Sequence, residues 1–198
     1  GHAFSAVLGH GRARTGGGKF LLRIDDLDPT RSRPEFVDAI YQDLRWLGLN
    51  GDEPVLVQSR RSGAYDQALD QLRERGLVYP CFCTRKKIAG EIAQAGEAQH
   101  GPDGPVYPGT CRELPQSERQ NRIARGDAHA LRLDVARAAA MTGALSFIEH
   151  GKRCPADPLR FGDIVLARKD LPAAYHLAVV VDDAHQGVTL VTRGEDLL

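Results

Sequence analysis

Three of the four cysteines are spaced in a way that suits a metal ion. Cys81 and Cys83 form a Cys-x-Cys pair, and Cys111 follows in the segment YPGTC, four positions after Tyr107. Zinc takes a tetrahedral set of soft ligands and binds thiols in their deprotonated form, so three thiolates and one oxygen or nitrogen donor would complete a structural site. Spacing alone leaves the alternative that these are small buried side chains. Cys154 stands apart from the group and is interpreted as an ordinary thiol.

A second group of reactive side chains is the acidic turn in LRIDDLDPTRS, residues 22–32. Asp25 comes directly after a strand pattern, and in open α/β sheets ligands collect at the carboxyl ends of strands. Its carboxylate could accept hydrogen bonds from an ammonium group. The alternative is that Asp25, Asp26 and Asp28 are turn and cap residues. Their position alone leaves both interpretations open.

The segment AYHLAVVVDDAHQGVTLVTRGEDLL, residues 174–198, places two more polar side chains beside apolar runs. Tyr175 precedes a run, residues 178–181, that we expect to be the most buried strand. Arg193 follows a second expected strand, and its planar guanidinium could bind a carboxylate through two hydrogen bonds. Without further context, a surface salt bridge is the favoured interpretation of Arg193.

The first 76 residues alternate between helix and strand patterns. Ser32 and Glu35 flank Pro34 as a capping box, and apolar side chains then recur at helical spacing. This alternation predicts a parallel α/β sheet with crossover helices. The expected elements are a helix from the chain start to Gly16, a strand at 19–24, a helix ending at Gly48, a strand at 55–57 and a helix ending at Gly76.

The pattern weakens after residue 76, which suggests a division into three parts. Residues 77–150 have little periodicity, contain the Cys-x-Cys pair and are expected to be an insertion. Residues 151–198 are expected to be the second part of the main domain, with short strand patterns from Phe161 on. The chain opens at Gly1-His2 without an initiator methionine and stops at Leu198. We therefore expect a fragment that lacks both ends of its domain.

Composition limits the class of protein. The chain has 198 residues, 42% of them hydrophobic, and 26 basic residues balance 26 acidic ones. These values exclude a disordered or fibrous chain, and they exclude a global cationic field for nucleic acid. No apolar run is long enough for a transmembrane helix, and no signal peptide is evident. We expect a reduced cytoplasmic protein that does not associate with membranes.

Taken together, these segments resemble class I glutamyl-tRNA synthetases. LRIDDLDPTRS is similar to their Arg-Ile-(Glu/Asp)-Asp stretch, Gly1-His2 to the end of their His-x-Gly-His nucleotide signature, and residues 174–198 to the block that closes their catalytic domain. The greatest resemblance is to the shortened glutamyl-queuosine tRNA(Asp) synthetase family. Glu113 stands where ordinary synthetases commonly have a zinc-binding histidine, and Tyr107 stands where the shortened family has its fourth ligand. The first half of the nucleotide signature and the Lys-Ser-Lys loop are absent from this chain.

The resemblance implies a Rossmann-like class I synthetase catalytic domain with an inserted zinc-bearing subdomain. It implies an enzyme that joins glutamate to ATP, giving glutamyl-adenylate and pyrophosphate, and transfers the glutamyl group to the queuosine base of tRNA(Asp). The residue roles that it implies are ATP binding by Gly1 and His2, with His2 also catalytic; binding of the glutamate α-ammonium by Asp25; binding of the glutamate side-chain carboxylate by Tyr175 and Arg193; and one structural Zn²⁺ held by Cys81, Cys83, Tyr107 and Cys111.

The implied substrates are ATP with Mg²⁺, L-glutamate and tRNA(Asp) that carries queuosine, and we expect a monomer. Residues 1–198 alone are expected to be inactive. One alternative is a truncated ordinary glutamyl-tRNA synthetase that charges tRNA(Glu). Another, of a different class, is a zinc-containing RNA-binding module without catalytic activity.

Overall fold

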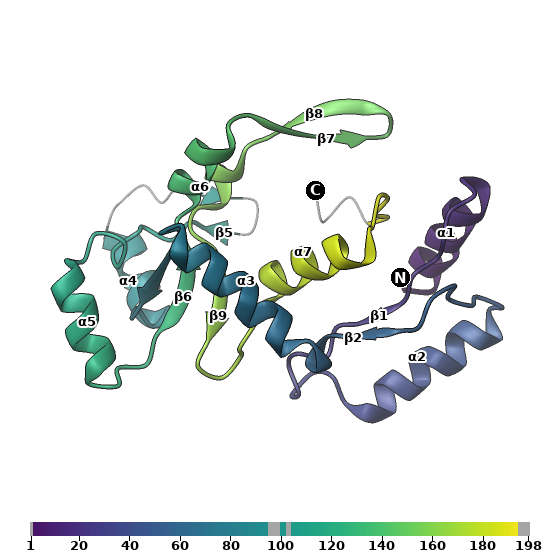
Figure 1. Ribbon diagram of the computed structural model, residues 1–198, viewed down its shortest axis with the longest axis horizontal. Coiled ribbons are helices and arrows are strands. Elements are labelled where there is room, and N and C mark those ends of the chain that lie inside the picture. The colour runs from purple at the N-terminus through teal and green to yellow at the C-terminus, as the bar shows by residue number, and fades with distance from the viewer. Residues whose placement is uncertain (1, 95–99, 102–103, 194–198) are drawn as a thin grey trace. The chain divides into compact units, whose positions relative to one another are not determined.

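A computed structural model describes residues 2–94, 100–101 and 104–193 (Figure 1). The chain divides into two compact units, Gly1–Gly63 with Ala178–Leu198, and Ala64–Leu177. Each unit is described by itself below. Among the described residues, no helix combines the length and the apolar character that crossing a membrane requires.

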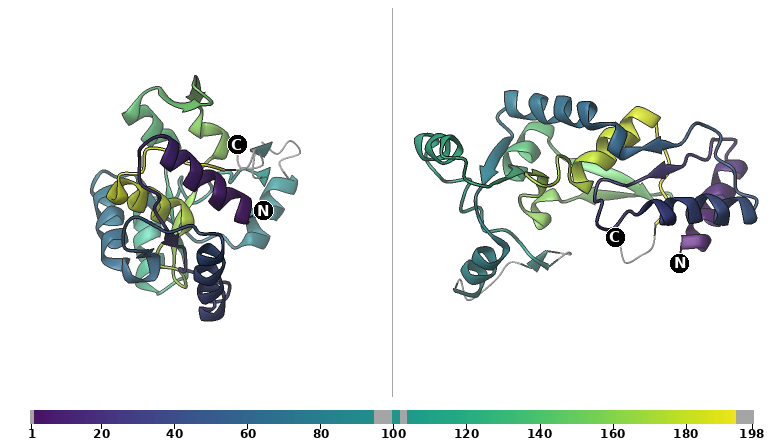
Figure 2. Two further views of the ribbon diagram at one scale, coloured as in Figure 1. Left: turned by 90° about the vertical axis from the view of Figure 1, so that its right-hand side faces the viewer. Right: turned by 90° about the horizontal axis from the view of Figure 1, so that it is seen from below.

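The first unit is built on a short parallel strand pair. Arg23 of β1 pairs with Leu56 of β2, and Ile24 pairs with Val57. Helix α2 connects the two strands, and α1 and α2 contact each other beside them (Figures 1 and 2). The parallel helix–strand order predicted from the sequence is confirmed here, with strands shorter than expected. The elements are α1 (His2–Thr15), β1 (Arg23–Ile24), α2 (Pro34–Trp46), β2 (Leu56–Val57) and the 3₁₀ helix η1 (Gln58–Arg60).

The two ends of α2 test the expected helix signals. Pro34 opens the helix as predicted, but the capping box is wrong, because the cap residue is Arg33 and makes no side-chain hydrogen bond. The Ser32 hydroxyl instead donates to the Asp25 carbonyl oxygen, 3.2 Å away. The predicted stop at Gly48 is confirmed, with φ of 69°, a left-handed conformation that glycine adopts without strain.

The second unit contains an antiparallel sheet with strand order β3-β6-β9. Cys81 at the end of β3 pairs with Ala130 of β6, so the sheet carries the first thiol. Buried side chains that include Tyr65, Leu69 and Tyr79 form its core. The elements are α3 (Ser62–Glu74), β3 (Val78–Cys81), α4 (Arg85–Gln94), β4 (His100–Gly101), β5 (Gly104–Pro105), α5 (Gln116–Ala124), β6 (Ala130–Leu133), α6 (Val135–Thr142), β7 (Leu145–Glu149), β8 (Lys152–Ala156), η2 (Pro158–Phe161) and β9 (Val165–Arg168).

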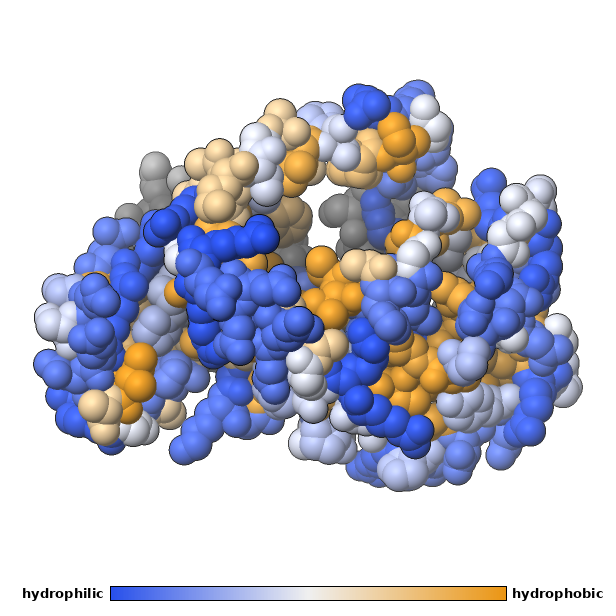
Figure 3. Space-filling view, in the orientation of Figure 1, coloured by the Kyte–Doolittle hydropathy of each residue, from blue (hydrophilic) through white to orange (hydrophobic). Residues whose placement is uncertain are grey.

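Strands β7 and β8 form a hairpin that extends beyond α6 (Figures 1 and 2). Its side chains are largely exposed, including Phe147 and Ile148. Figure 3 shows hydrophobic side chains along the hairpin next to hydrophilic ones. Cys154 lies in β8, far in sequence from the other three cysteines, and all four are free thiols.

The expected strand at residues 178–181 is wrong, because this segment lies inside helix α7 (Tyr175–Gln186). Leu177, Ala178 and Asp182 are buried whereas Val180 is 65% exposed, which is the burial period of a helix. Burial of that face therefore overrides the strand preference of three consecutive valines. The second expected strand is also wrong within the described residues, since 188–193 form neither helix nor strand.

Candidate metal centre and carboxylate site

Three thiols and one phenol meet in the core of the second unit. The Tyr107 hydroxyl lies 3.4 Å from Cys81 Sγ and 3.6 Å from Cys83 Sγ, and it accepts a hydrogen bond from the Cys111 backbone N–H at 2.9 Å. Cys83 Sγ and Cys111 Sγ are 3.4 Å apart. Cys81, Tyr107 and Cys111 are buried, with Phe82 and other apolar side chains packed around them. The structure thus brings together all four predicted ligands.

The spacing of these donor atoms is compatible with a zinc ion. The three sulfur atoms lie within 4.8 Å of one another. Zinc–sulfur bonds of about 2.3 Å in a tetrahedron place sulfur atoms about 3.8 Å apart, so only small movements would be needed. The Phe82 backbone N–H donates to Cys111 Sγ at 3.3 Å, a contact that stabilises a thiolate. The donor set therefore fits a structural zinc site.

Electrostatics in this cluster depends strongly on burial. Burial is the largest effect on Cys83 and, with its thiol neighbours, raises the pKa of this thiol to about 11. Burial also acts to raise the pKa of Cys111, but hydrogen bonds from the Tyr107 hydroxyl and the Phe82 amide outweigh it and lower that pKa. A cation that replaced the thiol protons would reverse the burial penalty, since bound zinc stabilises thiolates.

A buried carboxylate, Asp163, anchors the strands that carry the cluster. Its oxygens accept hydrogen bonds from the Tyr79 hydroxyl at 2.5 Å, from Arg112 at 2.9 Å and from the Val135 N–H at 3.0 Å. Arg132 donates to the Asp163 carbonyl oxygen, and its guanidinium stacks 4.0 Å above the Tyr107 ring. The sequence analysis missed this network, since its members are spread along the chain without a motif.

The three carboxylates of the acidic turn after β1 have different hydrogen-bond partners. Asp26 accepts hydrogen bonds from the backbone N–H and hydroxyl of Ser59, and Asp28 accepts from the backbone N–H and hydroxyl of Thr30. For Asp26 and Asp28, this agrees with the alternative given above, that the aspartates of this segment are turn and cap residues. Asp25 is exposed, and Arg23 donates to its Oδ1 at 2.9 Å. A carboxylate with one oxygen so held has a second oxygen able to accept from a ligand.

The remaining predicted residues lie in different places. His2 is exposed at the start of α1, and Gly1 lies outside the described residues. Arg193 is half-buried in the segment that follows α7, in the first unit. Tyr175 is the first residue of α7, is 62% exposed and belongs to the second unit. The roles expected for these residues stay predictions.

Sequence reasoning also missed a buried polar cluster in the first unit. The Asp182 carboxylate, fully buried, accepts hydrogen bonds from Gln58 Nε2 at 3.0 Å and from Arg61 Nε at 2.7 Å. Its neighbour Asp183 accepts from Arg23 at 2.5 Å. The signal available in the sequence was two aspartates inside an apolar run, because charged side chains are rarely buried without partners.

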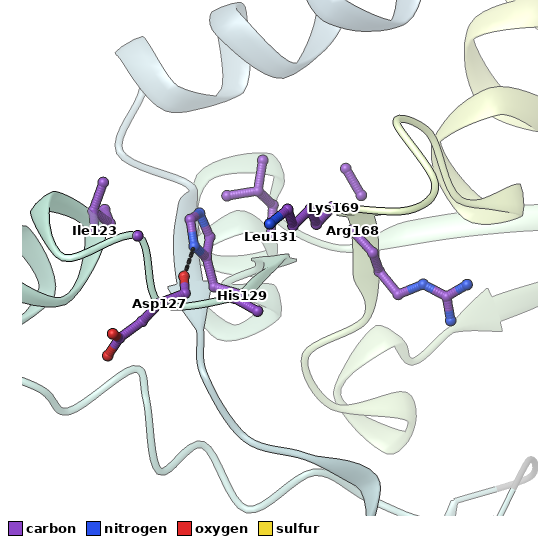
Figure 4. Close-up of a pocket in the computed structure, with 9 residues that line it drawn as sticks. Ile123, Asp127, His129, Leu131, Arg168 and Lys169 are labelled. Carbon is purple, nitrogen blue, oxygen red and sulfur yellow. Dashed lines mark hydrogen bonds between the residues drawn. The ribbon is translucent and has the colours of Figure 1, made fainter.

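An open pocket of about 370 Å³ lies in the second unit (Figure 4). The His129 ring, whose Nδ1 lies 3.0 Å from the Asp127 carbonyl oxygen, forms part of its wall. Cationic Arg168 and Lys169 line the pocket beside apolar side chains. The lining contains none of the residues predicted to bind ATP, glutamate or zinc, so the pocket is separate from those predictions.

Comparison with known proteins gives consistent results. All of residues 1–198 match the model of a family described as tRNA synthetases class I (E and Q), catalytic domain. A Rhodobacter capsulatus protein named glutamyl-Q tRNA(Asp) synthetase is 48% identical over the whole chain, and one of the same name from Nocardia farcinica is 47% identical. The chain spans 72% of the first protein and 59% of the second.

Solved structures of more distant relatives share the fold. A glutamate–tRNA synthetase from Elizabethkingia anophelis superposes with a TM-score of 0.77 at 24% identity, over 97% of this chain and 41% of its own. A glutamate tRNA ligase from Elizabethkingia meningosepticum, solved with its amino acid, gives a TM-score of 0.75, also at 24% identity, over 97% of this chain and 40% of its own. At that identity the likeness establishes the mixed α/β fold of the catalytic domain.

Proposed function

This chain belongs to the class I tRNA synthetases of the E and Q type and, within them, to the glutamyl-Q tRNA(Asp) synthetases; from this membership we propose that the protein is a ligase that activates glutamate with ATP and transfers it to the queuosine base of tRNA(Asp). The observation that carries the proposal is the 48% identity to a protein of that name across the whole chain. Because this chain spans 56% to 72% of such relatives, the proposal concerns the complete gene product.

Asp25 binds the α-ammonium group of glutamate in this proposal. The turn geometry supports it, because Asp26 and Asp28 are engaged by Ser59 and Thr30 while Asp25 is exposed at the end of β1. Tyr175 and Arg193 bind the side-chain carboxylate. These two assignments rest on the family resemblance and on the ability of a guanidinium to form paired hydrogen bonds with a carboxylate.

ATP, accompanied by Mg²⁺, binds at Gly1 and His2. The support here is that His2 starts α1, since a helix N-terminus favours phosphate groups. The glutamate carboxylate attacks the α-phosphate and pyrophosphate leaves, so no protein side chain has to form a covalent bond. The protein contributes positioning of the two reactants and stabilisation of charge that develops on the phosphates.

One Zn²⁺ is held by Cys81, Cys83, Tyr107 and Cys111. The convergence of these four donors in the core of the second unit supports this assignment. When bound, the ion crosslinks the end of β3 to the segment around Cys111, which is a structural contribution. We place it outside the reaction.

The decisive experiment is transfer of labelled glutamate by the complete gene product to three purified RNAs: tRNA(Asp) with queuosine, tRNA(Asp) without it, and tRNA(Glu). We expect glutamylation of the first alone, because the attacking hydroxyl belongs to the modified base. Charging of tRNA(Glu) would instead identify an ordinary glutamyl-tRNA synthetase. Absence of both activation and transfer would favour an RNA-binding module.

Amino-acid recognition is tested by glutamate-dependent ATP–pyrophosphate exchange. Arg193→Ala leaves the substrate carboxylate without its partner, a loss of roughly 2–5 kcal/mol by analogy with truncated charge pairs, so exchange is expected to fall by orders of magnitude. Unchanged exchange would show that Arg193 is a surface residue. Light scattering of the same preparation tests the expected monomer. From the proposed substrates, ATP and tRNA, we infer that the reaction takes place in the cytoplasm.

A further inference from the structure

Arg23 connects Asp25 to a second carboxylate on another element. Its Nε donates to Asp25 Oδ1 at 2.9 Å, and its Nη1 donates to Asp183 Oδ1 at 2.5 Å. The Arg23 side chain is only 18% exposed, whereas that of Asp25 is 42% exposed. A partly buried guanidinium therefore joins the exposed turn after β1 to the C-terminal half of α7.

The α7 end of this connection is firmly fixed. Asp182, next to Asp183, is fully buried and binds Gln58 and Arg61, both of which follow β2. These side chains form a neutral cluster, in which Asp182 and Arg61 balance each other. Because buried and fully hydrogen-bonded polar groups restrict their neighbours, Asp183 has little freedom to leave Arg23.

Charge explains why the second carboxylate matters. Arg23 and Asp25 alone sum to zero, which would give an incoming ammonium group little electrostatic attraction. With Asp183 included, the three side chains carry one net negative charge. Asp183 thus neutralises the charge of Arg23, and Arg23 still orients Asp25 through a charge-assisted hydrogen bond.

We propose that Asp183 is a positioning residue for amino-acid binding that acts through Arg23, fixing the Asp25 carboxylate and restoring the negative charge that attracts an α-ammonium group. The proposal rests on the proposed role of Asp25 in glutamate activation. It assigns to the C-terminal half of α7 a part in amino-acid binding that is distinct from the one proposed for Tyr175 at the start of this helix.

The test uses ATP–pyrophosphate exchange by the complete gene product, with glutarate as a competitive inhibitor. Glutarate has both carboxylates of glutamate and no ammonium group. Asp183→Asn is expected to raise KM for glutamate about 10- to 100-fold, the range of a hydrogen bond to a charged group. KM for ATP and the inhibition constant of glutarate should stay within about twofold of the wild type. Asp38→Asn, which removes an exposed charge from α2, is the matched control and should change none of them.

Several outcomes would overturn the proposal. Equal losses for glutamate, glutarate and ATP would show a merely structural role for Asp183. If Asp25→Ala raises KM for glutamate and Asp183→Asn does not, the positioning role fails while the ammonium site stands. If Asp25→Ala has no effect, the ammonium site itself fails. Should Asp183→Asn not fold, Arg23→Lys provides the same comparison, because one amine cannot bond both carboxylates in the geometry of a guanidinium. An unchanged KM for glutamate in Arg23→Lys would also overturn the proposal.

Discussion

Replacing Tyr107 with phenylalanine removes a single oxygen atom from the centre of the thiol cluster. In the absence of metal, the buried Cys111 N–H loses its acceptor at 2.9 Å, which costs about 1–3 kcal/mol of stability. With zinc bound, one of four ligands is lost. If the four share a binding free energy of roughly 10–16 kcal/mol, one ligand is worth about 3 kcal/mol, or about two orders of magnitude in zinc affinity.

Competition with a chromophoric chelator measures this change in affinity, and atomic emission measures stoichiometry. We expect one zinc per wild-type chain and weaker binding in Tyr107→Phe. Cys81→Ser combined with Cys111→Ser should remove stoichiometric zinc. Cys154→Ser is the matched control, because this thiol lies on the β7–β8 hairpin and should leave affinity and stoichiometry unchanged.

Two results would refute the reasoning. Wild-type affinity in Tyr107→Phe would show that the phenol is a hydrogen-bonding neighbour and not a ligand. Wild-type protein without zinc after purification in its presence would show that the cluster is a set of packed thiols. Hydrogen exchange adds a check, since loss of the metal should deprotect residues 77–94 and 104–112 more than β1 and β2.

Three further predictions concern stability. Gly162→Ala should lower the free energy of unfolding by roughly 2–4 kcal/mol, since φ is +62° and a Cβ would lie 2.3 Å from a methyl group of Val106. Gly48→Ala, at φ +69° with open space around it, should lower it by only about 1 kcal/mol. Urea unfolding measures both. Asp163→Ala should cost roughly 2–6 kcal/mol in the same assay, because a buried hydroxyl and a buried amide each lose an acceptor worth about 1–3 kcal/mol. The hydrogen bonds from Arg14 lower the pKa of Asp52. The pair therefore stabilises the fold above about pH 4, and this stabilisation is lost as the pH falls through the folded-state pKa. Asp52→Asn should flatten the acid side of the stability–pH curve, and an unchanged curve would contradict the pairing.

The side chains of the thiol cluster could be singled out from the sequence because the residue types that bind zinc are few. The Cys-x-Cys pair and the YPGTC segment indicated the three thiols, the family resemblance added Tyr107 as a ligand, and the structure brings the four side chains together. Helix ends marked by glycine were predictable for a similar reason, because the left-handed backbone at Gly48 strongly favours that residue. A glycine signal of this kind needs no knowledge of the rest of the chain.

Helix α7 shows where local signals fail. A run of valines favours a strand by propensity, but propensity is worth only tenths of a kcal/mol per residue. Burial of Leu177 and Ala178, together with the hydrogen bonds that Asp182 receives, outweighs it. The predicted capping box is absent for a similar reason, because the Ser32 hydroxyl donates instead to the carbonyl oxygen of Asp25, seven residues earlier. In both cases a tertiary contact decided the local structure.

The acidic turn combines both situations. Its carboxylates are equivalent in the sequence, where position alone could not separate a ligand from a turn residue. Asp26 is committed by Ser59, which lies 33 positions away, and Asp25 is oriented by Arg23, whose own charge is balanced by Asp183, 160 positions from it. Since those partners differ, so does the free energy available for binding a ligand. A carboxylate whose two oxygens already accept hydrogen bonds, as those of Asp26 do, gains little from an ammonium group. A carboxylate held by a guanidinium that a second carboxylate neutralises would keep its attraction for the ammonium group. The difference between Asp26 and the proposed ligand-binding Asp25 therefore depends on residues of α7 and of η1, far from this turn in the sequence.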